Sequence, residues 1–247
     1  MTSTALIPRV SVAPLPPNGP VSSLTGRIVE LLRVEEGDVV VDLSCHDLQS
    51  PRAMPQAIRL RAQPIVPCPF SERLAFLLST SGVRMVQMGA LTFERLPMRY
   101  EQVLLRDGFS EFKGSLHRLL TTVLRQLDPA GRVLIVDSAP SPDAPLFTEG
   151  LERWNRQRRS PESIARAMRE AGFSAHVETL ECLRRVPTAE CYAWVESRGW
   201  PGLESFREAD LQRGLCELRA RYGSQRAVEF MSRFDLVLGT KPDPLAT

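Results

Sequence analysis

Short runs of aliphatic and β-branched residues alternate along this sequence with segments that carry apolar residues at helical spacing. Continuous apolar runs are typical of strands buried on both faces of a parallel sheet. The two clearest runs are residues 38–43 and 132–137, and weaker ones fall at 64–66, 83–88, 102–105, 175–180 and 234–239. Regular alternation of this kind predicts βαβ units, and therefore an α/β fold with a doubly wound sheet and right-handed connections.

The segments between these runs have helical patterns and recognisable helix ends. Ser160 followed by Pro161 predicts a capped helix start, and Gly172 predicts its end. We expect helices at residues 22–33, 71–78, 116–127 and 160–170, and a largely helical stretch over 190–228.

The domain organisation follows from length and composition. A chain of 247 residues that is 43% hydrophobic can bury the core of one large α/β domain or of two small ones. Residues 1–21 are rich in proline and poor in large apolar residues, which predicts a flexible N-terminal arm. We expect one domain over 22–242, with 190–228 as a helical insertion or cap, and a tail at 243–247.

Composition also narrows the classes of partner. The formal net charge of +2 does not favour nucleic acid, and the basic stretch 153–159 is typical of a solvated helix face. No apolar run is long enough for a membrane span, and the N-terminus has no secretory pattern. Five cysteines without a CxxC motif predict neither a disulfide framework nor a zinc knuckle, so we expect a cytoplasmic location.

Four segments together resemble class I S-adenosylmethionine-dependent methyltransferases. Residues 127–137, LDPAGRVLIVD, are similar to the LxPGGRLLIVD motif of that family's fifth strand. Residues 31–43 resemble its first helix and strand, 164–173 its EAGF-ended helix, and 234–242 its last strand. The resemblance covers about 24–242 and implies a Rossmann-like, seven-stranded sheet whose last strand is antiparallel, with a helical insertion after the sixth strand.

Two further segments resemble the small-molecule type of these methyltransferases, which includes enzymes of secondary metabolism. They are residues 144–162, with Trp154, and residues 192–214. The resemblance implies that Trp194, Arg198 and Trp200 lie at a substrate pocket. Simple core packing of the tryptophans is the alternative, and Arg198 can instead pair with Glu204 or Glu208.

The resemblance places the cofactor pocket at seven residues, namely Asp42, Ser44, Cys45, His46, Gly89, Ala90 and Leu105. The family's first-turn glycines fall on Ser44, His46 and Leu48, and its adenine-binding acid falls on Gly89. Its ribose-binding acid falls on Pro67 or Pro69. Two lost charged hydrogen bonds at about 1.5–3 kcal/mol each weaken binding about a hundred-fold or more. We therefore expect no cofactor, or S-adenosylmethionine only if this altered site still binds it.

The Cys45-His46-Asp47 segment follows the first predicted strand. A thiolate beside an imidazole is a candidate nucleophile, which makes Cys45 and His46 the weak candidates for catalysis. Neighbouring side chains on a strand point apart, however, so a structural turn that fills the old pocket is the favoured interpretation. A metal site built from Cys45, His46 and Cys68 is a further alternative, although we expect no metal.

Three hypotheses about function remain open. The first is a pseudoenzyme that keeps the fold as a scaffold and acts as a homo-oligomer or as the partner of an active methyltransferase. The second is a repurposed biosynthetic enzyme, such as a cyclase or isomerase, that binds a small molecule without methyl transfer. The third is a divergent methyltransferase that still uses S-adenosylmethionine.

Overall fold

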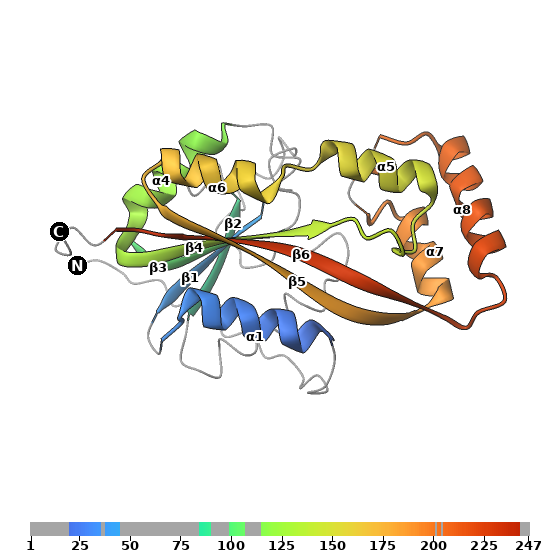
Figure 1. The fold of residues 1–247 in the computed structure, drawn as a ribbon, viewed down its shortest axis with the longest axis horizontal. Coiled ribbons are helices and arrows are strands. Elements are labelled where there is room, and N and C mark those ends of the chain that lie inside the picture. Colours follow the sequence, from blue (N-terminus) through green and yellow to red (C-terminus); the bar gives the residue numbers. More distant parts are fainter. Residues whose placement is uncertain are drawn as a thin grey trace, which may run out of the picture.

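The computed structural model describes residues 20–35, 38–44, 84–89, 99–106, 115–200, 202–203 and 205–242. Six strands in this part of the chain form one mixed sheet, in the order β2-β1-β3-β4-β6-β5 (Figure 1). The strands are β1 (Val39–Ser44), β2 (Arg84–Gly89), β3 (Tyr100–Arg106), β4 (Leu127–Ala139), β5 (Ser174–Pro187) and β6 (Ala227–Thr240). The first four are parallel to one another, and β6 is antiparallel to both β4 and β5. The expected Rossmann-like α/β fold with an antiparallel last strand is confirmed.

Helices cover both faces of the sheet and extend past one end of it. They are α1 (Pro20–Leu32), α4 (Leu116–Gln126), α5 (Thr148–Gln157), α6 (Pro161–Glu170), α7 (Thr188–Glu196) and α8 (Glu208–Tyr222). Figure 1 shows α1 on one face and α4 with α6 on the other, while α5, α7 and α8 lie together beyond the sheet. The arrangement is the doubly wound one that the alternating pattern predicts.

Each face of the sheet has its own hydrophobic core, and alternate residues of the same strands point into one core or the other. Val41 and Leu43 of β1 pack in a cluster with side chains of α4 and α6, whereas Val40 packs in a second cluster with α1. β3 and β4 alternate in the same way, with Leu104 on the α1 side and Leu105 on the other. Strands that bury both faces must be apolar at nearly every position, which explains their continuous apolar runs.

The ends of α6 show how the local sequence sets a helix. The Ser160 hydroxyl accepts a hydrogen bond from the backbone N–H of Ser163 at 3.2 Å, and Pro161 occupies the first turn. Gly172 follows the helix with a φ of 104°, a conformation that glycine adopts without steric cost. Its position lets the chain reverse into β5 within a few residues.

β5 and β6 continue as a two-stranded ribbon beyond the rest of the sheet. Each strand has 14 residues, and they pair along their whole length, from Ser174 opposite Thr240 to Pro187 opposite Ala227. β4 pairs with β6 only over Arg233–Thr240, so among the described residues no third strand joins the distal half of the ribbon. Figure 1 shows the ribbon reaching from the sheet to α7 and α8. The segments 175–180 and 234–239, where strands were expected, therefore cover less than half of the length of β5 and β6.

Several expected elements lie outside the described residues or have other bounds. The arm, of which only Pro20 and residue 21 are described, gives way to α1 two residues earlier than predicted. The predicted strand at 64–66, the helix at 71–78 and the tail at 243–247 lie outside the described part.

Candidate functional site

The carboxyl ends of the parallel strands lie at one level of the sheet. Ser44 is in register with Gly89 of β2 on one side and with Arg106 of β3 on the other. Arg106 in turn is in register with Val136 of β4. Ligands of open α/β sheets bind at this edge, so these residues define the place where a cofactor would bind.

The predicted cofactor-pocket residues divide between this edge and undescribed segments. Asp42 is in register with Gln87 and Leu104, two residues before the end of β1. Leu105 is fully buried in the core on the α4 and α6 side. Cys45, His46 and Ala90 lie outside the described residues, as do Leu48, Pro67, Cys68 and Pro69.

Two buried aspartates continue the edge onto β4 and β6. Asp137 faces Asp235 across the antiparallel pair, and both side chains are almost fully buried. Arg158, which follows α5, donates a hydrogen bond to the Asp235 carboxylate, and the Thr179 hydroxyl donates another at 3.1 Å. The charge of Asp235 is thus compensated inside the protein, so this carboxylate is not directed at a ligand.

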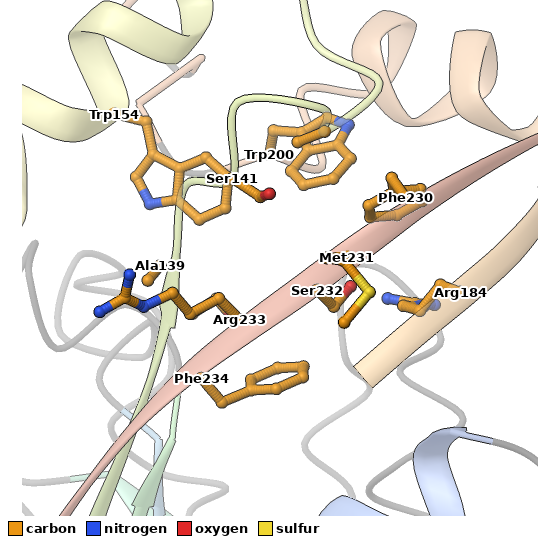
Figure 2. Close-up of a pocket in the computed structure, with 12 residues that line it drawn as sticks. Ala139, Ser141, Trp154, Arg184, Trp200, Phe230, Met231, Ser232, Arg233 and Phe234 are labelled. Carbon is orange, nitrogen blue, oxygen red and sulfur yellow. The ribbon is translucent and has the colours of Figure 1, made fainter. Parts of the chain in front are cut away.

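A small hollow of about 60 Å³ lies next to this edge, between the sheet and the distal helices (Figure 2). Its walls come from the end of β4, the loop before α5, α5 itself, the segment after α7, and the facing strands β5 and β6. The lining residues that Figure 2 labels are Ala139, Ser141, Trp154, Arg184, Trp200, Phe230, Met231, Ser232, Arg233 and Phe234. Pockets for drug-sized ligands measure about 300–1,000 Å³, so this hollow accommodates only a few atoms.

The aromatic side chains around the hollow form one packed group. The Trp200 ring lies 5.5 Å from that of Trp154, 5.6 Å from that of Trp194 and 6.3 Å from that of Phe230. Trp200 Nε1 and the Tyr192 hydroxyl are buried without a hydrogen-bond partner among the described residues. Aromatic rings at these separations stabilise one another, so this group forms a well-packed wall of the hollow.

Two arginines approach the hollow from opposite sides, as Figure 2 shows. The Arg184 guanidinium lies 5.4 Å from the Trp194 ring centre and 5.9 Å from that of Phe230. Arg233 Nε lies 3.9 Å from a carboxylate oxygen of Asp235. Arg184 has no carboxylate partner among the described residues, so it is the cation at this site that retains its capacity to bind an anion.

Hydrogen bonds to Asp143 hold the loop between β4 and α5, which forms one wall of the hollow. The Ser141 hydroxyl donates to the Asp143 carboxylate, and that carboxylate also accepts the backbone N–H of Met231 at 2.9 Å. Burial alone would raise the pKa of Asp143, but these hydrogen bonds outweigh it and the pKa is lowered. The ionised carboxylate thus ties the loop after β4 to β6.

The structure separates the three predicted substrate-pocket residues. Trp200 lines the hollow, and Trp194 packs edge-on against Trp200. Arg198 does not line the hollow, because its guanidinium donates to Glu208 at 3.2 Å and to the backbone carbonyl of Phe206 at 3.4 Å. The sequence allows Arg198 to pair with either Glu204 or Glu208, and the structure has the pair with Glu208.

The basic stretch 153–159 is largely engaged in contacts within the chain. Arg153 lies 4.5 Å above the Phe206 ring centre, Arg156 pairs with Glu152, and Arg158 holds Asp235. The described residues contain no group of three or more His, Cys, Asp or Glu side chains arranged to hold a metal ion. Within the same residues, no helix is both long enough and apolar enough to cross a bilayer.

Comparison with known proteins adds a likeness of fold. No protein-family model matches the sequence, and no curated protein matches it. Phosphoethanolamine N-methyltransferase 2 of Haemonchus contortus is 13% identical with a TM-score of 0.46, and the match covers 90% of this chain. This chain spans 53% of that one, about half its length.

Two other solved structures are similar to this chain over nearly all of its length. The YcgJ protein of Bacillus subtilis is 18% identical with a TM-score of 0.49, and the match covers 89% of this chain and 98% of that one. The cyclase SpnF is 16% identical with a TM-score of 0.45, over 90% of this chain and 81% of its own. At these identities, and with TM-scores below 0.5, the likeness carries no conclusion about activity, cofactor or partner.

Proposed function

We propose that this protein is a methyltransferase-fold scaffold that has lost the S-adenosylmethionine reaction and acts as a partner subunit of a methyltransferase or of a biosynthetic assembly. The observation that carries the proposal is the pairing of Ser44 with Gly89 at the carboxyl edge of the sheet. The family resemblance implies a glycine at the first position and a carboxylate at the second. Two changed cofactor positions therefore lie side by side on neighbouring strands.

The energetic consequence supports the proposal. Gly89 has no side chain that could accept a hydrogen bond from the adenine amino group, and Ser44 adds a Cβ and a hydroxyl where the family has only hydrogen. One lost charged hydrogen bond costs about 1.5–3 kcal/mol, which is about tenfold to a hundred-fold in affinity. Weak or absent cofactor binding is the expected result of the two changes together.

Calorimetric titration of the full chain with S-adenosylmethionine and S-adenosylhomocysteine tests the first part of this proposal. We expect no saturable heat up to about 1 mM ligand, the weak limit of ordinary affinities. Micromolar binding of either compound would overturn the loss of the cofactor site, and methyl transfer to any acceptor would establish a divergent active enzyme instead.

The partner-subunit part needs a separate experiment. A methyltransferase encoded beside this chain, purified and mixed with it, is the appropriate partner to test. We expect a complex in analytical ultracentrifugation and a change in that enzyme's kcat. A mixture that sediments as two independent species with unchanged kcat would contradict the partner role while leaving the cofactor result untouched.

The hollow favours a second candidate function, that of a repurposed enzyme or binding protein for a small anionic molecule. Arg184 and the surrounding aromatic rings would recognise the carboxylate end of such a ligand. Trp154 and Trp200 line the hollow, so intrinsic fluorescence reports its occupancy, with acetate as the probe. A saturable change that Arg184→Gln abolishes and the exposed control Arg226→Gln retains would favour this second function.

A further inference from the structure

The outer edge of β5 lies at the margin of the sheet. β5 is the last strand in the order, so among the described residues no strand pairs with its outer side. Its distal half pairs only with β6, in the ribbon that extends beyond β4. Backbone N–H and C=O groups on such an edge can pair with a strand of another chain.

Three exposed residues share one face of this distal half. Glu181, Leu183 and Arg185 are spaced by two, so their side chains point to the same side of the ribbon. Leu183 is 58% exposed and is the only large hydrophobic side chain in the described part of the chain that is exposed. Cys182 and Val186, on the opposite face, are buried. An exposed leucine at the midpoint between opposite charges is the feature that requires an explanation.

We propose that two copies of this chain associate by antiparallel pairing of their β5 edges, centred on Leu183. A twofold axis at this residue places Leu183 opposite its counterpart in the second copy. The same axis places Glu181 of each copy opposite Arg185 of the other, because these residues lie two positions before and two after the centre. The partner is a second copy because the pattern of charges is complementary to itself.

Other registers lose this complementarity. A centre at Cys182 places Leu183 opposite a glutamate, and a centre at Arg184 places it opposite an arginine. Centres at Glu181 or Arg185 place like charges directly opposite each other, which is unfavourable. On the face formed by Glu181, Leu183 and Arg185, the register centred on Leu183 is the one of these five that forms two ion pairs and one apolar pair.

The second strand of the ribbon extends the same pattern. Glu181 faces Arg233 of β6, Leu183 faces Met231, and Arg185 faces Glu229. Across the four strands of the dimer, the outer rows then alternate in charge and the central row is apolar throughout. Arg185 lies 3.6 Å from Glu229 with 74% of its side chain exposed, so it can contact a carboxylate on each side.

This inference stands apart from the proposed function, since it concerns self-association whether or not the chain binds a cofactor. Sedimentation equilibrium of the full chain over a range of concentrations tests it. We expect a reversible dimer, with a dissociation constant at least tenfold higher for E181R and for R185E. The double variant E181R/R185E restores the charge pairs between the two copies but places like charges opposite Arg233 and Glu229 within each ribbon, so it should dimerise more tightly than either single variant and less tightly than the original chain.

An equimolar mixture of the two single variants provides the sharpest test. One variant carries two arginines on this face and the other carries two glutamates, so together they should form a one-to-one dimer that neither forms alone. E170R, at an exposed site on α6, is the control and should leave dimerisation unchanged. Thermal unfolding of every variant checks that it is folded.

Three outcomes would overturn the proposal. The first is a wild-type chain that remains monomeric at several hundred micromolar. The second is a dimer that survives both single charge reversals, since its interface would then lie elsewhere. The third is folded single variants that stay monomeric when they are mixed.

Discussion

Arg158 donates a hydrogen bond to the carboxylate of Asp235 and thereby joins the end of α5 to a buried position on β6. Asp235 is only 1% exposed, whereas Arg158 keeps part of its side chain at the surface. The contact also fixes Trp154, because the backbone N–H of Arg158 bonds to the Trp154 carbonyl at 3.2 Å. One ion pair therefore stabilises both the sheet and a wall of the hollow.

Removing the cation from this pair should be strongly destabilising. We expect Arg158→Leu to lower the free energy of unfolding by about 3 kcal/mol, because it removes the hydrogen-bonded cation from a buried carboxylate and leaves only Thr179 and the more distant Arg233 beside it. Urea denaturation measures the change. Arg156→Leu is the matched control on the same helix, where the pair with Glu152 is exposed and is worth less than about 1 kcal/mol. Equal effects of the two substitutions would contradict the assigned role.

The ion pair between Arg27 and Glu178 should make stability depend on pH. Arg27 Nε donates to Glu178 Oε1 at 2.7 Å, and this hydrogen bond lowers the pKa of Glu178 from its ordinary value of 4.5. A lowered pKa in the folded state means that the stabilisation is present above 4.5 and is lost as pH falls through the folded value. We expect Glu178→Gln to cost about 1 kcal/mol at pH 7 and progressively less below pH 4.5.

Unfolding of this variant and of wild type in urea across a pH series measures that difference. Glu170→Gln, on the exposed face of α6, is the control and should show little difference at any pH. A cost for Glu178→Gln that stays constant between pH 7 and pH 3 would show that the ion pair does not produce the shift.

Two helical glycines should respond to alanine in opposite directions. A Cβ at Gly26 of α1 meets no atom within 4 Å, whereas a Cβ at Gly214 of α8 would lie 2.4 Å from the Phe147 ring. Alanine favours helix over glycine by about 1 kcal/mol, so Gly26→Ala should stabilise the protein by up to that amount. Gly214→Ala should destabilise it by about 1–3 kcal/mol despite the same propensity gain. Thermal melts with matched calorimetry distinguish the signs.

The cysteines should differ sharply in reactivity. Burial, aided by the nearby charge of Glu190, raises the pKa of the Cys191 thiol to about 11, whereas Cys216 of α8 is exposed. The thiolate is the reactive form, so iodoacetamide at pH 8 should modify Cys216 in the folded protein and leave Cys191 unmodified. Peptide mass spectrometry over a time course gives the two rates, and both cysteines should react in 6 M urea. Equal rates without denaturant would refute the burial of Cys191.

The sequence predicts the sheet best where strands are buried on both faces. The run at 132–137 lies inside β4, since a strand covered by helices on both sides must be apolar at nearly every position. Residues 128–131, between the helix expected at 116–127 and this run, also lie within β4, where the register to β3 shifts and Ala130 has a φ of 60°.

The distal ribbon was missed because it follows a different pattern. Residues 181–187 and 227–233 mix apolar, polar and charged side chains without a regular period, although burial alternates along much of both strands in the structure. A search for continuous apolar runs ends at Leu180 and resumes at Phe234. The pairing of these residues depends on strand partners distant in sequence, so their local pattern does not predict the hairpin.

The same omission affects the candidate site. Arg184, Phe230 and Met231 line the hollow, yet all three belong to the part of the ribbon that was not assigned to strands. Trp200 was named from the resemblance, and its ring contacts with Trp154 and Phe230 depend on segments distant in sequence. Such contacts follow from the register of β5 and β6, which no local pattern specifies.

The segment that covers the hollow enters and leaves the ribbon at one paired position, where Pro187 faces Ala227. Next to this pair, the backbone N–H of Thr188 donates a hydrogen bond to the Arg226 carbonyl at 3.1 Å, which holds the two ends of the segment together. Because the two ends of this segment meet, a change in its length can leave the register of β5 and β6 unaltered. Residues 188–226 nevertheless share a buried core with Leu146, Phe147 and Trp154, so the length can vary only at positions outside these contacts.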